Sequence, residues 1–166
     1  MRPEIVISSV VVLWFVILGC QEDTLCQWKK FEKLDFQERQ RAIYDCSPDQ
    51  QVDLFLRATF ENAPPDVEKL SEPLASLGEH VAPAIVARIE RLETSEQYQT
   101  LELLFVLLRM EHGGYFAVSR DDGLMQRLDT AISRLHEPAV KDAAEGIVRW
   151  IRDPRSPPSS EVTTGR

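Results

Sequence analysis

Apolar residues recur at every third or fourth position along most of the chain from residue 27 to residue 152, which is the spacing of amphipathic α-helices. Capping residues and prolines separate these stretches. The chain holds 7 glycines, and Asp122-Gly123 is its only Asn-Gly or Asp-Gly dipeptide, so a turn-rich β fold is disfavoured. We therefore predict an all-α fold, either an irregular helical bundle or a short array of α-α repeats.

Eight helices are expected in this region. They contain or follow Trp28, Asp35, Ser47-Pro48, Leu70–Leu77, Val81–Leu92, Tyr98–Met110, Leu124–Leu135 and Pro138. A side-chain oxygen of Ser47 should accept from the first amides of its helix, and Pro73 should restrict regular structure before it. The stretch Tyr98–Met110 carries so few polar residues that its helix should be central and buried on most sides.

An unusually apolar loop is expected between Gly113 and Gly123. Tyr115, Phe116 and Arg120 within it are residue types that anchor protein interfaces when they are exposed, so they form the candidate partner surface. The alternative is that Tyr115 and Phe116 fold back into the core, as the apolar residues of a long loop often do. Trp150 in the last helix leaves the same two possibilities open.

The first nineteen residues have the outline of a secretory signal peptide. The apolar run from Ile5 to Leu18 has fourteen residues, which suits the central part of a signal peptide and is shorter than the roughly 20 needed to span a bilayer. We therefore expect export, with an uncleaved signal anchor or cleavage by an ordinary signal peptidase as alternatives.

Four residues at the end of this run sharpen the expectation. Ile17-Leu18-Gly19-Cys20 resembles the lipobox of bacterial lipoproteins. The resemblance implies cleavage after Gly19, lipid attachment at Cys20, and anchoring in the bacterial cell envelope. Gln21 in place of an aspartate favours the outer membrane, facing the periplasm. Two or more acyl chains hold a protein on a membrane stably, so the partner implied here is the membrane itself.

Two further cysteines, Cys26 and Cys46, remain in the exported chain. An oxidising compartment favours a disulfide between them, and two free buried thiols are the alternative. A zinc site is disfavoured, because two thiols twenty positions apart lack the ligand spacing of such sites. The predicted organisation is therefore a signal peptide at 1–19, a lipidated tether at 20–26, a helical domain at 27–152 and a disordered tail at 153–166.

The last six helices group as pairs that begin near Pro48, Val81 and Leu124, at intervals of about 33 and 43 residues. The run from Leu77 to Ile85, which places a proline before an aliphatic helix, resembles the helix-opening segment of HEAT-type repeats. The resemblance implies an array of stacked helix pairs.

Charge and candidate chemistry narrow the function. The formal net charge of -8 disfavours nucleic-acid binding, which relies on clustered lysine and arginine. His80, His112 and His136 lie at expected helix ends, outside any catalytic motif, and Asp121-Asp122 is better explained as a helix cap than as a cation site. We expect no enzyme activity, metal or cofactor.

The leading hypothesis is thus an envelope lipoprotein that binds an unidentified protein or serves as a scaffold. An acidic immunity or inhibitor protein acting on a basic toxin or enzyme is the second hypothesis, and a small envelope hydrolase or ligand carrier is the third.

Overall fold

The computed structural model describes residues 26–61 and 66–153. Within these ranges the chain is helical and contains no strand, so the all-α prediction is confirmed. The α-helices are α2 (Trp28–Phe31), α3 (Phe36–Tyr44), α4 (Pro48–Glu61), α5 (Asp66–Ser76), α6 (Ala82–Arg91), α7 (Gln97–Gly113), α8 (Asp122–Ser133) and α9 (Pro138–Arg152). The predicted signal peptide at 1–19, Cys20 and residues 154–166 of the predicted tail lie outside the described residues.

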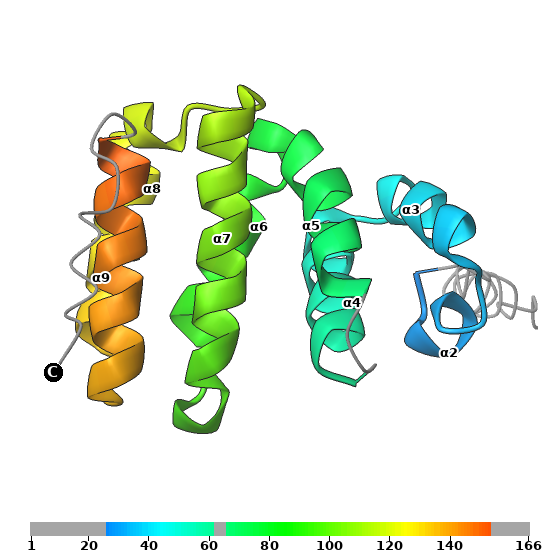
Figure 1. Ribbon diagram of the computed structural model, residues 1–166, viewed down its shortest axis with the longest axis horizontal. Coiled ribbons are helices and arrows are strands. Elements are labelled where there is room, and N and C mark those ends of the chain that lie inside the picture. Colours follow the sequence, from blue (N-terminus) through cyan, green and yellow to red (C-terminus); the bar gives the residue numbers. More distant parts are fainter. Residues whose placement is uncertain (1–25, 62–65, 154–166) are drawn as a thin grey trace, which may run out of the picture.

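The helices form two packed layers (Figure 1). Helices α5, α7 and α9 stand side by side in one layer, and α4, α6 and α8 lie behind them in the other. Successive helices pair across the layers, α4 with α5, α6 with α7 and α8 with α9. The short N-terminal helices continue this order, because α3 packs on α5 and α2 packs on α4.

The N-terminal hydrogen bonds of α3 agree with the prediction from the sequence, whereas those of α4 do not. Asp35 caps α3 as predicted: its Oδ1 accepts from the Glu38 amide at 2.9 Å, and the Glu38 carboxylate accepts from the Asp35 amide at 3.0 Å. Helix α4 also begins where predicted. The hydrogen bonds seen at its start run in the opposite sense, because Ser47 donates from its amide and its hydroxyl to Oε1 of Gln50.

Helix α5 departs from its prediction, since regular structure begins at Asp66 and continues through Pro73. Burial of Pro73 with Leu70 and Leu74 accounts for this, because packing compensates for the backbone hydrogen bond that a proline cannot donate. Two residues beyond the helix, the chain adopts a conformation that favours glycine. Gly78 has φ of +54°, and a Cβ there would lie 2.7 Å from the Tyr115 carbonyl oxygen.

Helix α7 is the central element, in contact with α5, α6 and α9. Five of its apolar side chains are fully buried: Leu103, Leu104, Val106, Leu107 and Met110. The prediction that it is buried on most sides is therefore right, and one side remains exposed. Tyr98 at its start is 62% exposed. Phe105 keeps 48% of its surface exposed, because none of the helices in contact with α7 covers the side on which it lies.

Both ends of α7 bind neighbouring segments. At its start the buried Gln97 side chain accepts from the amides of His136 and Glu137 at 3.1 and 3.0 Å, and so caps the beginning of α9. At its end the helix passes beyond Met110 to Gly113, and Gly114 follows in the left-handed conformation with φ of +72°.

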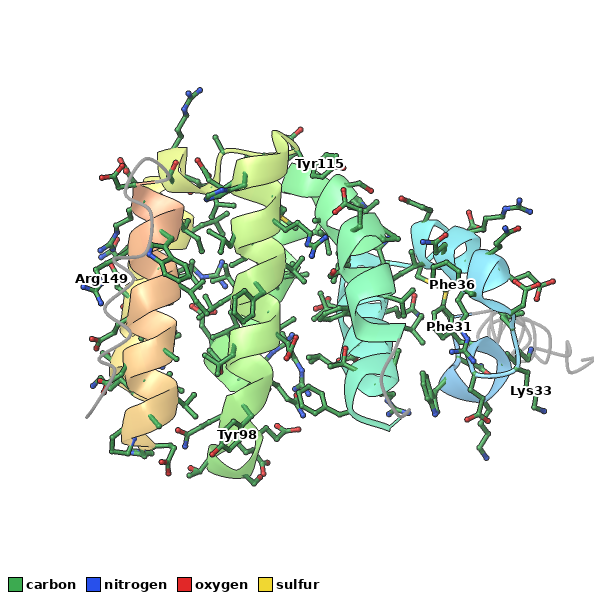
Figure 2. All side chains as sticks on the ribbon, in the orientation of Figure 1. Phe31, Lys33, Phe36, Tyr98, Tyr115 and Arg149 are labelled. Carbon is green, nitrogen blue, oxygen red and sulfur yellow. A yellow bond between two sulfur atoms is a disulfide. The ribbon has the colours of Figure 1, made fainter. Side chains whose placement is uncertain are left out.

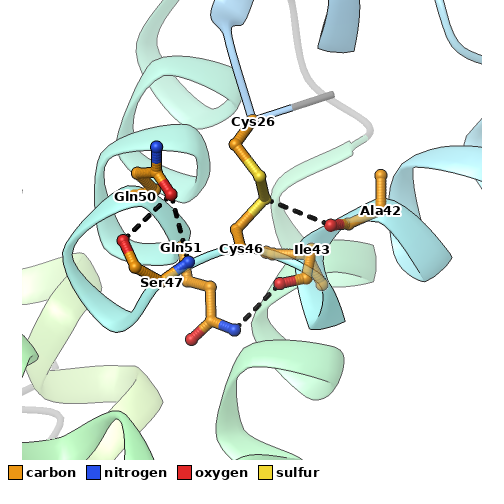
Figure 3. The surroundings of a disulfide bond; sticks show 7 residues. All are labelled: Cys26, Ala42, Ile43, Cys46, Ser47, Gln50 and Gln51. Atoms are coloured by element: carbon orange, nitrogen blue, oxygen red, sulfur yellow. Dashed lines mark hydrogen bonds between the residues drawn. A yellow bond between two sulfur atoms is a disulfide. The ribbon is translucent and has the colours of Figure 1, made fainter. Parts of the chain in front are cut away.

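Cys26 and Cys46 form a disulfide, which confirms that prediction (Figure 3). Their Cα atoms are 5.6 Å apart, within the usual range. Cys46 Sγ lies 3.1 Å from the carbonyl oxygen of Ala42, a sulfur–oxygen contact, because a disulfide sulfur carries no hydrogen to donate. Beside it, the buried Gln51 donates to the Ile43 carbonyl at 2.9 Å and ties α4 to the end of α3.

Replacing both Cys26 and Cys46 by alanine is expected to lower the free energy of unfolding by about 3 kcal/mol, because the bond closes a loop of about 21 residues in the unfolded chain. Urea denaturation measures the change. Reductant should lower the stability of the wild type to that of the double variant and leave the variant unchanged. Equal stability of the oxidised wild type and the variant would contradict the expectation.

Candidate functional site

The predicted partner surface does not form one continuous site, because its three residues lie in different surroundings. Tyr115 is 42% exposed and its hydroxyl donates to the carboxylate of Glu72 on α5. Phe116 packs against the core, as the alternative interpretation expected. Arg120 is exposed on a 3₁₀ turn, Val118–Arg120, that packs against α7, α8 and α9.

Backbone and side-chain hydrogen bonds fix the loop that carries these residues. The amides of Tyr115 and Phe116 both donate to the Met110 carbonyl, at 3.1 and 3.3 Å. Farther along, Glu111 accepts from the amide and the hydroxyl of Ser119 at 3.1 and 2.8 Å. The loop thus holds Tyr115 in a defined position just beyond the C-terminal end of α7, on the side toward α5 (Figure 2).

A groove of about 430 Å³ lies between α5 and α7. The buried Phe55 of α4 contributes to its lining, and Ser71 lines it from α5. Its α7 wall contains Glu102, Phe105, Leu108, Arg109 and His112. These α7 residues are spaced so that they share one face of the helix. The groove therefore opens on the one side of α7 that its neighbouring helices leave uncovered.

Glu102 is the unusual group in this groove. Burial raises the pKa of its carboxyl, and no neighbouring cation offsets that effect. Within the described part of the chain, Glu102 takes part in no hydrogen bond or ion pair. A half-buried carboxylate without a partner lowers stability, since desolvation of its charge is not compensated.

A second groove, of about 550 Å³, lies between α3 and α5. Tyr44 from α3 and Tyr115 from the loop both line it, together with polar side chains of α3 and α5. Tyr44 is 49% exposed, and its hydroxyl is 2.9 Å from that of Ser76. Two half-exposed tyrosines are thus held in place beside one groove.

Glu72 links the two grooves. It accepts from Tyr115 and from Arg109, whose guanidinium is 3.0 Å away. The hydrogen bond from Tyr115, followed by that from Arg109, holds the pKa of Glu72 below its ordinary value, and the same contact raises the pKa of Tyr115. We call the surface formed by the two grooves and by Tyr44, Phe105 and Tyr115 the aromatic face.

Ion pairs join neighbouring helices in the layer formed by α4, α6 and α8, as the Arg109–Glu72 pair joins α7 to α5. Arg91 and Arg88 of α6 lie 3.3 and 3.7 Å from Asp49 and Asp53 of α4. Glu90 of α6 accepts twice from Arg127 of α8, at 2.9 and 2.6 Å. Many charges on this layer are therefore already neutralised by a neighbour.

The other candidate groups do not converge. His80, His112 and His136 are exposed, and they lie on three different segments. Asp121 accepts from the Leu124 amide at 2.9 Å, so it caps α8 as predicted. In residues 26–61 and 66–153, no group of three or more potential ligands could hold a metal ion. Glu102 and His112 are about 15 Å apart along the axis of α7, too far for a proton to pass between them.

Sequence reasoning found Tyr115 and missed Tyr44, Glu102 and Phe105. A signal for the last two was present, because Tyr98, Glu102, Phe105, Arg109 and His112 recur at three- and four-residue spacing. That stripe contains charged residues in an otherwise apolar helix, and so it marks the side of α7 that faces solvent. Tyr44 carried no comparable signal, since its neighbours on α3 are polar on several sides.

Comparisons with protein-family models, curated proteins and solved structures find no match to this chain. Of the helices that the structure describes, none has the length and apolar character required to cross a membrane.

Phe116→Ala is expected to lower the free energy of unfolding by about 2 kcal/mol, because it removes a ring that packs against the core. Tyr115→Ala should cost less than about 1 kcal/mol, since its ring is largely exposed and its one hydroxyl hydrogen bond is on the surface. Urea denaturation of both variants measures the difference. The opposite ranking would contradict these positions.

Glu102→Gln is expected to raise the melting temperature at pH 7 by about 2–4 °C, because the amide removes a desolvated charge. The folded state raises the pKa of Glu102, so the folded protein binds its proton more tightly than the unfolded chain does. Stability therefore falls as pH rises through the pKa of this group. The advantage of the variant should shrink as pH is lowered from 7 toward 4, which calorimetry at several pH values will show.

The matched control is Glu79→Gln, which replaces an exposed carboxylate outside the grooves. It should leave the melting temperature unchanged at every pH. A gain at Glu102 that did not depend on pH would show that packing of the side chain, rather than its charge, is responsible.

Proposed function

We propose that this chain is a lipid-anchored protein of the bacterial cell envelope that binds another protein through the aromatic face and carries out no catalysis. The observation that carries the binding role is the exposure of three aromatic side chains, each between 42% and 49%, in two grooves that the Arg109–Glu72 pair connects: Phe105 in one, and Tyr44 and Tyr115 in the other. Exposed tyrosine and phenylalanine beside a concave surface are typical of the residues that contribute most to protein interfaces.

The arrangement of the helices supports the same role. We propose that the stacked pairs α4/α5, α6/α7 and α8/α9 form a HEAT-like array. Packing of each helix on its partner and on the equivalent helix of the next pair is consistent with such an array. Proteins of this architecture use an extended layer of helices to bind partners, and here the aromatic face spans α3, α5 and α7.

The anchoring part of the proposal rests on the lipobox-like Ile17-Leu18-Gly19-Cys20 and on the disulfide. A disulfide between Cys26 and Cys46 fits an exported protein, because cytosolic reductants keep most thiols reduced. Lipid on Cys20 would hold the helical domain at the membrane surface. We propose that the protein is anchored in the outer membrane and faces the periplasm.

Binding is tested by cross-linking and affinity capture from the envelope of a bacterium that expresses the full chain. The double variant Tyr44→Ala/Tyr115→Ala should reduce the recovered partner at least tenfold, since each exposed aromatic ring is expected to contribute more than about 1 kcal/mol. Phe60→Ala is the matched control, because Phe60 is 49% exposed on α4 and lies outside both grooves. Equal recovery with all variants would refute a role of the aromatic face.

Anchoring is tested separately by metabolic labelling with a radioactive fatty acid. The wild type should incorporate label and fractionate with the membrane, whereas Cys20→Ala should do neither, because the proposed attachment atom is its thiol. Label retained by the Cys20→Ala variant would place the lipid elsewhere.

An acidic inhibitor of a basic toxin or enzyme is the second candidate function. The net charge of -8 and the unpaired Glu102 in a groove favour it. Its complex should weaken steeply as salt concentration rises, because attraction between opposite net charges is screened. A salt-independent complex would favour the general binding role.

A further inference from the structure

The groove between α5 and α7 contains a negative charge that the fold leaves unsatisfied. Glu102 is half-buried, and among the described residues it accepts no hydrogen bond and pairs with no cation. Arg109, which lines the same groove, is already committed to Glu72 at 3.0 Å. His112 lies about three helical turns farther along α7. A positive group entering near Glu102 would therefore find a free carboxylate.

The aromatic ring beside Glu102 limits what that group can be. Phe105 lies one turn from Glu102 on the same face of α7 and is 48% exposed. A cation over the face of an aromatic ring is attracted to it, and a flat guanidinium also stacks on the ring. Leu108 lines the remainder with apolar surface suited to a methylene chain.

An apolar side chain fits this groove poorly. It would remove water from Glu102 without supplying a partner, and an uncompensated buried carboxylate costs more than the contact would contribute. An acidic side chain would add repulsion to that cost. Charge complementarity therefore selects a cationic occupant, and the ring favours the planar cation of arginine over the ammonium of lysine.

We propose that the groove between α5 and α7 receives an arginine side chain from the partner protein, with its guanidinium paired to the carboxylate of Glu102 and stacked on the ring of Phe105, and with its stem along Leu108. This inference rests on the proposed function, because it takes the aromatic face as the contact surface and adds the chemistry of the partner. The net charge of -8 would draw a basic segment toward the protein before the specific contact forms.

The test uses a capped tripeptide, acetyl-Gly-Arg-Gly-amide, titrated into the isotope-labelled protein and followed by NMR. Chemical shifts should change around Glu102 and Phe105, with millimolar affinity. The citrulline peptide, which keeps the planar shape and loses the charge, should bind at least fivefold more weakly. The lysine peptide should also bind more weakly than the arginine peptide, since an ammonium does not stack on a ring.

Variants of the chain complete the test. Glu102→Gln should weaken arginine binding at least fivefold, and its higher melting temperature would show that the variant is folded. Phe105→Leu keeps an apolar side chain and should remove the preference for arginine over lysine. Glu79→Gln should bind as the wild type does. Equal binding of the arginine and citrulline peptides, or unchanged binding by Glu102→Gln, would overturn the proposal.

Failure of this inference can be told apart from failure of the proposed function. A captured partner that depends on Tyr44 and Tyr115 and is retained by Glu102→Gln would leave the aromatic face as an interface and refute the arginine site. Specific arginine binding without any captured partner would establish the site and refute the protein-binding role.

Discussion

The burial of α7 is the constraint on which the rest of the structure depends. Its run of leucines, valine and methionine cannot face water, so α5, α6 and α9 must cover it on three sides. Helices α5 and α9 bury their own apolar side chains against α4 and α8, which lie with α6 in the second layer. The two-layered arrangement thus follows from one helix that is too apolar to lie on the surface.

The same helix also positions the candidate site. At its start Gln97 caps α9, and at its end Gly114 turns the chain so that Tyr115 reaches Glu72 on α5. Gly78 is required where the turn after α5 meets the loop after α7, because a side chain there would collide with the Tyr115 carbonyl. The aromatic face is therefore held by contacts that also stabilise the core, and its side chains need little reordering before a partner binds.

The sequence predicted the features that depend on local or periodic patterns. The Asp35 cap, the positions of the helices and the central place of α7 follow from spacing and capping residues. The pairing of Cys26 with Cys46 follows from the expectation that Cys20 carries lipid, which leaves these two cysteines to pair. What the sequence could not predict depends on contacts between distant residues. The link between Glu72, Arg109 and Tyr115 joins positions about 40 residues apart, and a helical period contains no information about it.

Glu102 differs from the carboxylates that pair with arginines of adjacent helices, and this difference gives the aromatic face its chemistry. On α4, α6 and α8, carboxylates meet arginines of the adjacent helix, so attraction between helices uses those charges within the fold. On α7, Glu102 faces a groove in which Arg109, the arginine among the described lining residues, is paired with Glu72. A group whose charge is already paired gains little by binding a partner. An unpaired carboxylate that has already lost part of its hydration gains an ion pair that compensates for that loss. Recognition of a cation therefore belongs to the position where the fold leaves a carboxylate unsatisfied, and the overall charge of -8 only increases how often a basic partner reaches it.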